Sequence, residues 1–492
     1  MNRAHLGCAV LGWSMMAVCG MGRNGLAQSA TPPSQSDEPS KQELLDEVRA
    51  LRAEVKDLHQ RIDQQQPPAT RPSGGASATP FTAGAAPDDL MHDIDRHQSL
   101  EISPLTAGWD PAKGFVIRSE DGNFLLHPWA FIQIREATNY RRGAKTGGGD
   151  STDSGLELPR MKFIFDGNMF TPDFTYQFIW AVNTEGAAAP AGGTVFLQDA
   201  WGRYHFPGTP FAIRAGNIRD PFDHEQILFA TRSLTPERSI VNNVMVNADN
   251  IVKGATIAYG FDTPYPGGRS SPVRVEAGYT GGMRNTGTNF QPFPVNPASW
   301  GAAGRVDFKF FGRWTDYTQF TSIDDKEPLL VAGAGVDYTE AGSTRQFSHV
   351  GDVQFDTPNG LALYAAYLGR YTTNNSGPPG TNGAQTTHGV YPDTYDSTLR
   401  FQLAYLLGHN FEPFARYEYL HFSNIELPKG SARDTIQDIT VGFNYYFVGH
   451  RSKISCAASY LPDGSPIANT QSDLLTNRRN EVIVQLQYQL MI

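Results

Sequence analysis

The last twelve residues of the chain alternate between two kinds of side chain. They read EVIVQLQYQLMI, in which every second position from Val482 to Ile492 is apolar or aromatic and most positions between them are Gln or Glu. A period of two is the pattern of a β-strand with one apolar face and one polar face. Soluble sandwiches and transmembrane barrels both contain such strands, so this segment alone does not separate the two folds.

The same alternation recurs along the chain from about Lys113 to the C-terminus. Counting these segments from about residue 124 gives roughly sixteen strands, of which those near 195, 252, 331 and 349 are the weakest. Gly, Pro, Asn and Asp separate them, as expected for turns. The clearest segments are MKFIFDGNM (161–169), FTYQFIWAV (174–182), GRVDFKF (304–310), STLRFQLAY (397–405) and DITVGFNYYF (438–447).

The connections between these segments are unequal in length. Residues 283–299 and 373–396 are long and polar, whereas the trio Thr171-Pro172-Asp173 leaves room only for a tight turn. Tight turns at one end and long loops at the other are typical of outer-membrane barrels. The sequence therefore predicts an all-β fold, a transmembrane antiparallel β-barrel of about 16 strands over residues 111–492, preceded by a short coiled-coil helix.

The N-terminal segment has the features of a secretory signal peptide. Arg3 precedes an apolar run, and the small residues Gly25 to Ala27 precede a plausible cleavage point, so we assign residues 1–27 to the signal. An anchor helix that stays attached is the alternative. Cleavage would remove Cys8 and Cys19 and leave Cys456 as the sole cysteine, which excludes an intrachain disulfide.

Residues 41–63 carry a heptad pattern that predicts a coiled coil. The apolar positions follow spacings of four and three, with Leu at d and mostly Val at a, which favours two strands. A lone amphipathic helix on the protein's own surface is the alternative. Residues 28–40 are predicted to be disordered, and residues 64–110, rich at first in Pro, Gly, Ser and Ala, to form a linker. The seam positions are Leu44, Val48, Leu51, Val55, Leu58 and Ile62.

Composition excludes several classes of protein. Charged residues make up 18% of the chain, mean hydropathy is −0.38, and no apolar run long enough for a helical membrane span occurs beyond the N-terminus. The net charge of −10 argues against nucleic acid as a partner.

One segment carries a family resemblance. Residues 212–241, AIRAGNIRDPFDHEQILFATRSLTPERSIV, contain Arg214 and Gly216, then Asp220-Pro221-Phe222, and later Glu225 and Glu237-Arg238-Ser239. This arrangement resembles the phosphate-selective porin O and P family. The resemblance implies a sixteen-stranded barrel, usually a trimer, with an inward-folded constriction loop. The chain departs from the family in having no lysine in residues 221–241 and in ending on Ile492 rather than an aromatic residue.

The residue types in this segment also favour a loop that enters the pore. Asp220-Pro221 ends strand pairing, because proline fixes φ and lacks an N–H. We expect residues 227–229 to pack against the wall, and Arg232 and Arg238 to line a passage. The alternative for these two arginines is that they are solvated or pair with Glu225 and Glu237. The candidate constriction-loop residues are Asp220, Pro221, Phe222, Glu225, Arg232, Glu237 and Arg238.

Basic residues opposite the apolar strand faces are candidates for the pore lining. Rings of Arg or Lys lower the barrier for anions, and guanidinium matches phosphate or carboxylate oxygens in pairs. Asp166, Asp307, Asp352 and Glu418 would share the lumen, so the alternative is that the charges pair and only keep it wet. The candidates are Arg135, Arg160, Lys162, Arg203, Arg214, Arg305, Lys309, Arg400 and Arg416.

The sequence predicts no catalytic site, metal or cofactor. His224-Glu225 begins like a zinc-binding helix motif but lacks the second histidine. We therefore expect a passive outer-membrane channel for small, anionic solutes such as phosphate. Its expected partners are outer-membrane lipid and further copies of the chain as a homotrimer, with the N-terminal region in the periplasm. The alternatives are a tether that binds the cell wall through the coiled coil, and a secreted β-rich carbohydrate-handling protein.

Overall fold

The structure, a computed structural model, describes most of residues 105–492. The described ranges are 105–110, 114–145, 147–183, 194–246, 251–261, 270–283, 299–341, 344–373, 393–423, 434–469, 472–477 and 479–492. The predicted signal peptide, coiled coil and most of the predicted linker lie outside these residues.

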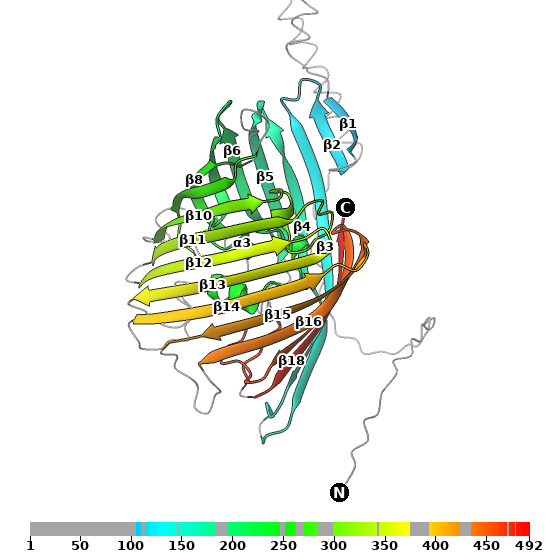
Figure 1. Ribbon diagram of the computed structural model, residues 1–492, viewed down its shortest axis with the longest axis vertical. Helices are drawn as coiled ribbons and strands as arrows, with labels where there is room; N and C mark the ends of the chain where they lie inside the picture. The colour runs from blue at the N-terminus through cyan, green and yellow to red at the C-terminus, as the bar shows by residue number, and fades with distance from the viewer. Residues whose placement is uncertain are drawn as a thin grey trace, which may run out of the picture. The chain divides into compact units, whose positions relative to one another are not determined.

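Sixteen antiparallel strands, β3 to β18, form a closed barrel (Figure 1). Each strand pairs with the next along the chain, and β18 pairs with β3 to close the ring. The predicted number of strands is confirmed, and the four weak segments are β6, β8, β11 and β12. The first eight strands are β3 (Leu125–Arg141), β4 (Ser151–Met169), β5 (Thr171–Asn183), β6 (Thr194–His205), β7 (Phe211–Arg219), β8 (Ile251–Tyr259), β9 (Val273–Thr280) and β10 (Ser299–Phe311). The others are β11 (Leu329–Ala341), β12 (Thr344–Asp356), β13 (Leu361–Thr373), β14 (Asp393–Tyr405), β15 (Phe411–His421), β16 (Thr435–Val448), β17 (Ser452–Leu461) and β18 (Glu481–Met491).

A two-stranded hairpin precedes the barrel. It consists of β1 (Leu105–Asp110) and β2 (Gly114–Ser119), and β2 pairs with the start of β3 at Ile117↔Leu126 and Arg118↔Leu125. Residues 105–110, which the sequence places in the linker, are therefore a strand. The segment LTAGWD is too short and too weakly alternating to be recognised as a strand without its partner.

The alternating side chains have the orientation that a membrane wall requires. On β14, Phe401 is 47% exposed whereas its neighbours Arg400 and Gln402 are 1% and 5% exposed. The outward rows of β10, β16 and β18 are likewise exposed, and their polar neighbours face the interior. A continuous apolar belt of this size is stable against hydrocarbon rather than water. Among the described residues, no helix is both long enough and apolar enough to cross a bilayer.

The two ends of the barrel differ in their connections. At one end, here called the turn end, the short links 206–210, 357–360, 406–410 and 449–451 join neighbouring strands; the opposite end is called the loop end. The turn between β4 and β5 lies at Phe170, whose φ of 66° is left-handed. The trio Thr171-Pro172-Asp173, predicted to be that turn, instead begins β5. Residues 260–272 and 312–328 are longer links at the turn end.

Candidate functional site

A long connection folds into the barrel between β7 and β8. This inward loop, residues 220–246, contains the short helices α3 (His224–Ile227), η1 (Ala230–Arg232) and η2 (Asn242–Val246). All its residues are buried except Ile227, Phe229 and Arg232. As predicted, strand pairing ends at Asp220-Pro221. The side chain of Asp223 then caps α3 by accepting from the backbone N–H of Gln226 at 3.3 Å.

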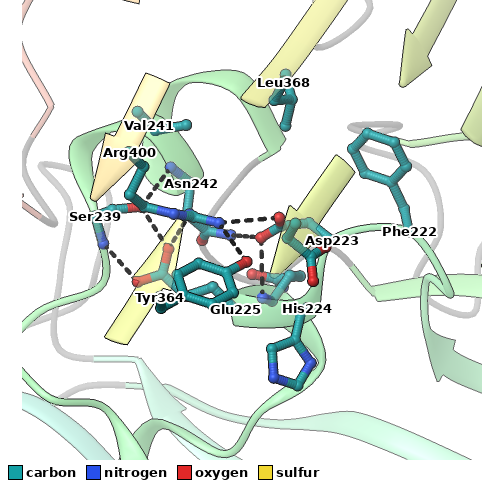
Figure 2. Close-up of polar contacts among 12 residues, drawn as sticks. Phe222, Asp223, His224, Glu225, Ser239, Val241, Asn242, Tyr364, Leu368 and Arg400 are labelled. Carbon is teal, nitrogen blue, oxygen red and sulfur yellow. Dashed lines mark hydrogen bonds and ion pairs between the residues drawn. The ribbon is translucent and has the colours of Figure 1, made fainter. Parts of the chain in front are cut away.

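One buried arginine anchors the first half of the loop (Figure 2). Arg400 of β14 forms ion pairs with Asp223, at 3.1 Å, and with Glu225. It also donates to the hydroxyls of Ser239 at 2.8 Å and Tyr364 at 3.1 Å. Glu225 in turn accepts from the backbone N–H of Ser239 at 3.0 Å. These bonds tie both ends of the loop to one guanidinium.

A second ionic cluster anchors the loop to β3 and β4. Glu237 accepts from Arg160 of β4 and from Arg135 of β3, the latter at 3.1 Å. Arg135 also pairs with Glu157 and, at 3.4 Å, with Asp473. Burial alone would raise the pKa of Glu237, but Arg160 and Arg135 outweigh it and lower that pKa to about 2. Glu237 therefore stays ionised in its buried place.

The backbone of the loop is bonded to the wall between these two anchors. Lys453 donates to the carbonyl of Ser233 at 2.8 Å, and Asn444 donates to that of Leu234 at 2.8 Å. Buried carbonyls without partners would be costly, so these side chains make the inward position stable. Further donors to loop carbonyls are Gln489 to Thr231, Arg416 to Glu237 and Arg305 to Phe222.

Two glycines of β11 make room for the loop. Their sequence, Ala-Gly-Ala-Gly, places Gly333 and Gly335 on the inward face. A Cβ at Gly335 would lie 2.3 Å from the carbonyl oxygen of Phe222, and one at Gly333 would lie 2.0 Å from a guanidinium nitrogen of Arg305. That arginine pairs with Asp307 at 2.7 Å and Asp352 at 2.8 Å. These glycines were not among the predicted site residues; their signal in the sequence is a strand whose inward positions lack side chains.

We expect Gly335→Val to displace the inward loop from β11. The new side chain meets the backbone of Phe222, and overpacking of this kind costs about 1–3 kcal/mol. Tryptic cleavage after Arg232 or Arg238 should become faster than in the unaltered protein. Ala334→Val is the matched control, because Ala334 is exposed on the outward face of the same strand. Equal cleavage rates of the two variants would contradict the proposed contact.

A second segment enters the barrel from the turn end. This turn-side segment, residues 312–328, contains η3 (Asp316–Thr318). The ring of Tyr317 stacks on that of His224 with centroids 3.9 Å apart and an interplanar angle of 8°. Thr321 donates to Glu412, and Gln319 contacts His450 at 3.0 Å. Segments from opposite ends thus meet inside the barrel, an arrangement that was not predicted from the sequence.

The nine predicted pore-lining residues all occupy strand positions that face the lumen. Seven of them form ion pairs with carboxylates of the wall or the loop, as the alternative interpretation of these charges had it. Lys162 is buried, and Lys309 donates to Ser270 at 2.9 Å. The pairs not given above are Arg203 with Glu276 at 3.7 Å, Arg214 with Glu276 at 2.6 Å and Arg416 with Glu418 at 2.9 Å.

The predicted constriction-loop residues separate into two groups. Six are buried, namely Asp220, Pro221, Phe222, Glu225, Glu237 and Arg238. Arg232 is exposed and donates to the hydroxyl of Thr318, and Arg238 donates to the carbonyl of Leu228 at 2.9 Å. Within the described residues no ion pair joins Arg232 to a carboxylate. Glu225 and Glu237, the carboxylates with which it could have paired, instead form ion pairs with arginines of the barrel wall.

A cavity of about 1150 Å³ lies on the turn side of the inward loop. The three loop residues that are not buried, Ile227, Phe229 and Arg232, all line it. Phe229 packs on Trp129 of β3 with ring centroids 5.8 Å apart, so the expected contact with the wall is present. Asp166, also in the lining, accepts from the indole N–H of Trp129 at 2.8 Å and contacts His127 at 3.0 Å.

Among the described residues, no cluster of three or more His, Cys, Asp or Glu side chains is placed to hold a metal ion.

No family model and no curated protein matches the sequence. Solved structures of outer-membrane porins align with it at low identity. An anion-selective porin from Comamonas acidovorans is 11% identical over 75% of this chain and 99% of its own, with a TM-score of 0.47. OmpF of Salmonella typhi in complex with daunomycin is 14% identical over 75% and 98%, with a TM-score of 0.48. The channel DcaP of Acinetobacter baumannii is 11% identical over 76% and 99%, with a TM-score of 0.44. At this level the likeness assigns neither a solute nor a role to the chain.

Proposed function

We propose that the chain is an outer-membrane channel through which small water-soluble solutes diffuse passively. The observation that carries this proposal is the sidedness of the closed barrel, with exposed apolar rows outside and ionic side chains inside. A wall of this kind separates hydrocarbon from water. The inward loop and the turn-side segment fill much of the lumen, so the path is narrow for a barrel of this size. The role needs no cofactor and no catalytic group.

We propose that small anions are the preferred solutes. The seven ion-paired arginines of the barrel wall do not select them. Each of those arginines already forms an ion pair with a carboxylate, as Arg203, Arg214, Arg305 and Arg400 do. Arg232, which faces the cavity without an ion-pair partner among the described residues, is positioned to lower the barrier for an anion. Phosphate is one candidate among such anions.

The proposal is tested by reconstituting the protein in planar bilayers and measuring reversal potentials in KCl gradients. We expect steady conductance steps with chloride more permeant than potassium. Arg232→Gln should lower the chloride preference about twofold or more, because a unit charge near a narrow path contributes on the order of 1 kcal/mol. Arg142→Gln is the control, since Arg142 is exposed at the loop end.

Two results would contradict this function. A correctly folded barrel without conductance would favour the alternative of a tether between the outer membrane and the cell wall. A preference for potassium would leave the channel but remove the proposed selectivity. The secreted carbohydrate-handling protein is disfavoured by the exposed apolar belt, and partition of the folded protein into water without detergent would restore it.

We further propose that the barrel assembles as a homotrimer, with the coiled coil of residues 41–63 on the periplasmic side. The a and d residues of that seam favour two strands, whereas the larger contact is expected between barrels. Chemical cross-linking in native membranes should capture trimers. Capture of dimers alone would contradict this assembly.

A further inference from the structure

A third segment folds into the barrel, in this case from the loop end. It is the connection between β17 and β18, residues 462–480, and we call it the lid. The lid has hydrogen bonds of its own. The backbone groups of Ser465 and Asn477 exchange two, at 3.1 and 2.9 Å, and those of Asn469 and Leu474 exchange two more, at 2.9 and 3.0 Å. These bonds lie within the lid, so they do not depend on its contacts with the rest of the barrel.

The lid packs on the inward loop. Leu474 is fully buried in one apolar cluster with Val241 and Met245 of that loop. The side-chain amide of Asn243 donates to the hydroxyl of Ser472 at 2.8 Å. Because the lid enters from the loop end and rests on η2, it covers this part of the inward loop and narrows the loop-end mouth.

Asp473 ties the lid to the barrel wall. Its carboxylate accepts from the side chain of Gln485 of β18 at 2.6 Å and pairs with Arg135 of β3 at 3.4 Å. Its carbonyl accepts from the side chain of Asn139 at 2.7 Å. The φ of Asp473 is 54°, a left-handed value that Asp and Asn tolerate better than most residues. All three contacts join the lid to the wall, so all three are lost when the lid lifts.

Glu481 is a second carboxyl group beneath the lid. It is the first residue of β18 and is fully buried. Its carboxylate accepts from the backbone N–H of Leu475 at 3.0 Å and from the side chain of Asn139 at 2.5 Å. The lid therefore rests on two carboxyl groups, and lifting it brings both into contact with water.

The charges around the lid favour uptake of a proton. Arg135 forms ion pairs with three carboxylates, those of Asp473, Glu157 and Glu237. Burial, strengthened by Glu157, raises the pKa of Asp473 to about 6, although Arg135 opposes this shift. The charged groups that face the two carboxyls are Arg135 and Arg141 of β3, Glu157 and Arg160 of β4 and Glu237 of the inward loop, and the lid itself adds Asp463 and Arg479.

This shift makes the position of the lid depend on pH. With the lid in place the pKa of Asp473 is about 6, whereas its ordinary value in water is 3.8. Between these values the closed lid holds a proton that the lifted lid has released. Closure therefore becomes more stable as pH falls below 6, by about tenfold at pH 5, and loses this contribution as pH rises through 6. Glu237 acts in the opposite direction, but only below its ordinary pKa of 4.5.

We propose that the lid is an acid-closed gate at the loop end of the channel, held down when Asp473 and Glu481 take up protons and released when they lose them. This inference rests on the channel function proposed above and adds its regulation.

Hydrogen exchange of the full-length protein in detergent micelles tests the gate. Relative to the chemical exchange rate at each pH, peptides from residues 462–480 should be protected about tenfold or more at pH 5 than at pH 7. Asp473→Asn should shrink this difference about tenfold without lowering protection at pH 7, as loss of a structural bond would. Glu481→Gln should also shrink it. Asp153→Asn is the control, because that loop-end side chain is 56% exposed.

Conductance supplies the second measurement. In planar bilayers with the same pH on both sides, conductance should fall from pH 7 to pH 5, and Asp473→Asn should reduce this fall. The proposal is overturned if the lid is less protected at pH 5, or if Asp473→Asn and Glu481→Gln both keep the unaltered pH dependence. Should Asp473→Asn not fold, Glu481→Gln decides.

The two measurements separate the gate from the channel. Exchange needs no conductance, so a silent barrel whose lid follows pH would contradict the channel and keep the proton-linked closure. A conducting barrel whose lid ignores pH would contradict the gate and keep the channel.

Discussion

Replacing Arg400 with Met is expected to free the first half of the inward loop and to raise single-channel conductance severalfold. The side chain is fully buried and pairs with Asp223 and Glu225, which are equally buried. Removing one partner of a buried ionic cluster leaves the other charges uncompensated, at a cost of about 3–5 kcal/mol. The loop should leave the interior, where water can solvate those carboxylates. Conductance in planar bilayers measures the change, and tryptic cleavage after Arg232 or Arg238 reports release of the loop.

A surface pair provides the control for this prediction. Arg141 pairs with Asp153, whose side chain is 56% exposed, so Arg141→Met should cost about 1 kcal/mol or less and leave conductance unchanged. Adding Glu225→Gln to Arg400→Met should restore part of the lost stability, because it removes one stranded charge. A protected loop and unchanged conductance in Arg400→Met would show that the loop is held by its backbone bonds alone.

Glu237→Gln is expected to weaken the second anchor and to abolish part of the acid response of the channel. The substitution leaves Arg135 and Arg160 short of one carboxylate in a buried place, at a cost of about 3 kcal/mol. Because the folded pKa of Glu237 is lowered to about 2, its contribution is complete above the ordinary value of 4.5 and disappears as pH falls toward 2. The unaltered protein should therefore lose stability over that range. Thermal unfolding in detergent at pH 2 to 7 measures both effects.

Glu157→Gln is the comparison for this second prediction. Glu157 also pairs with Arg135, but its side chain is 28% exposed, so its loss should cost less and change the acid profile less. If Glu237→Gln and the unaltered protein have the same stability at pH 7 and the same acid profile, the two arginines have found other partners. That outcome would remove Glu237 from the set of anchors.

Much of the wall is predictable from the sequence because strand sidedness is a local property. The rows beginning at Met161, Val306 and Leu399 are outward as their period requires, and the number of strands follows from counting such rows. The start of the inward loop is also readable, since Asp220-Pro221 breaks pairing through its own chemistry. These features depend on neighbours a few residues away.

The partners inside the barrel are not predictable in this way. Arg400 and Glu225 are 175 residues apart in the chain, and they meet because the closed ring places β14 opposite the inward loop. The alternation of neighbouring side chains carries no information on contacts between residues that are so far apart in the chain. The same reason applies to the turn-side segment, whose aromatic residues find partners only across the lumen. The sequence therefore predicted that these arginines could bind solutes, whereas in the structure they form ion pairs with carboxylates.

The position of the inward loop sets an order of events for folding. Its residues bond to Gln489 on β18 and to Arg135 on β3, the two strands whose pairing closes the ring. The loop can make both sets of contacts together only once the first and last strands have met. Closure of the ring is then a late step that depends on contacts distant in the chain. Docking of the loop and closure of the ring therefore stabilise each other.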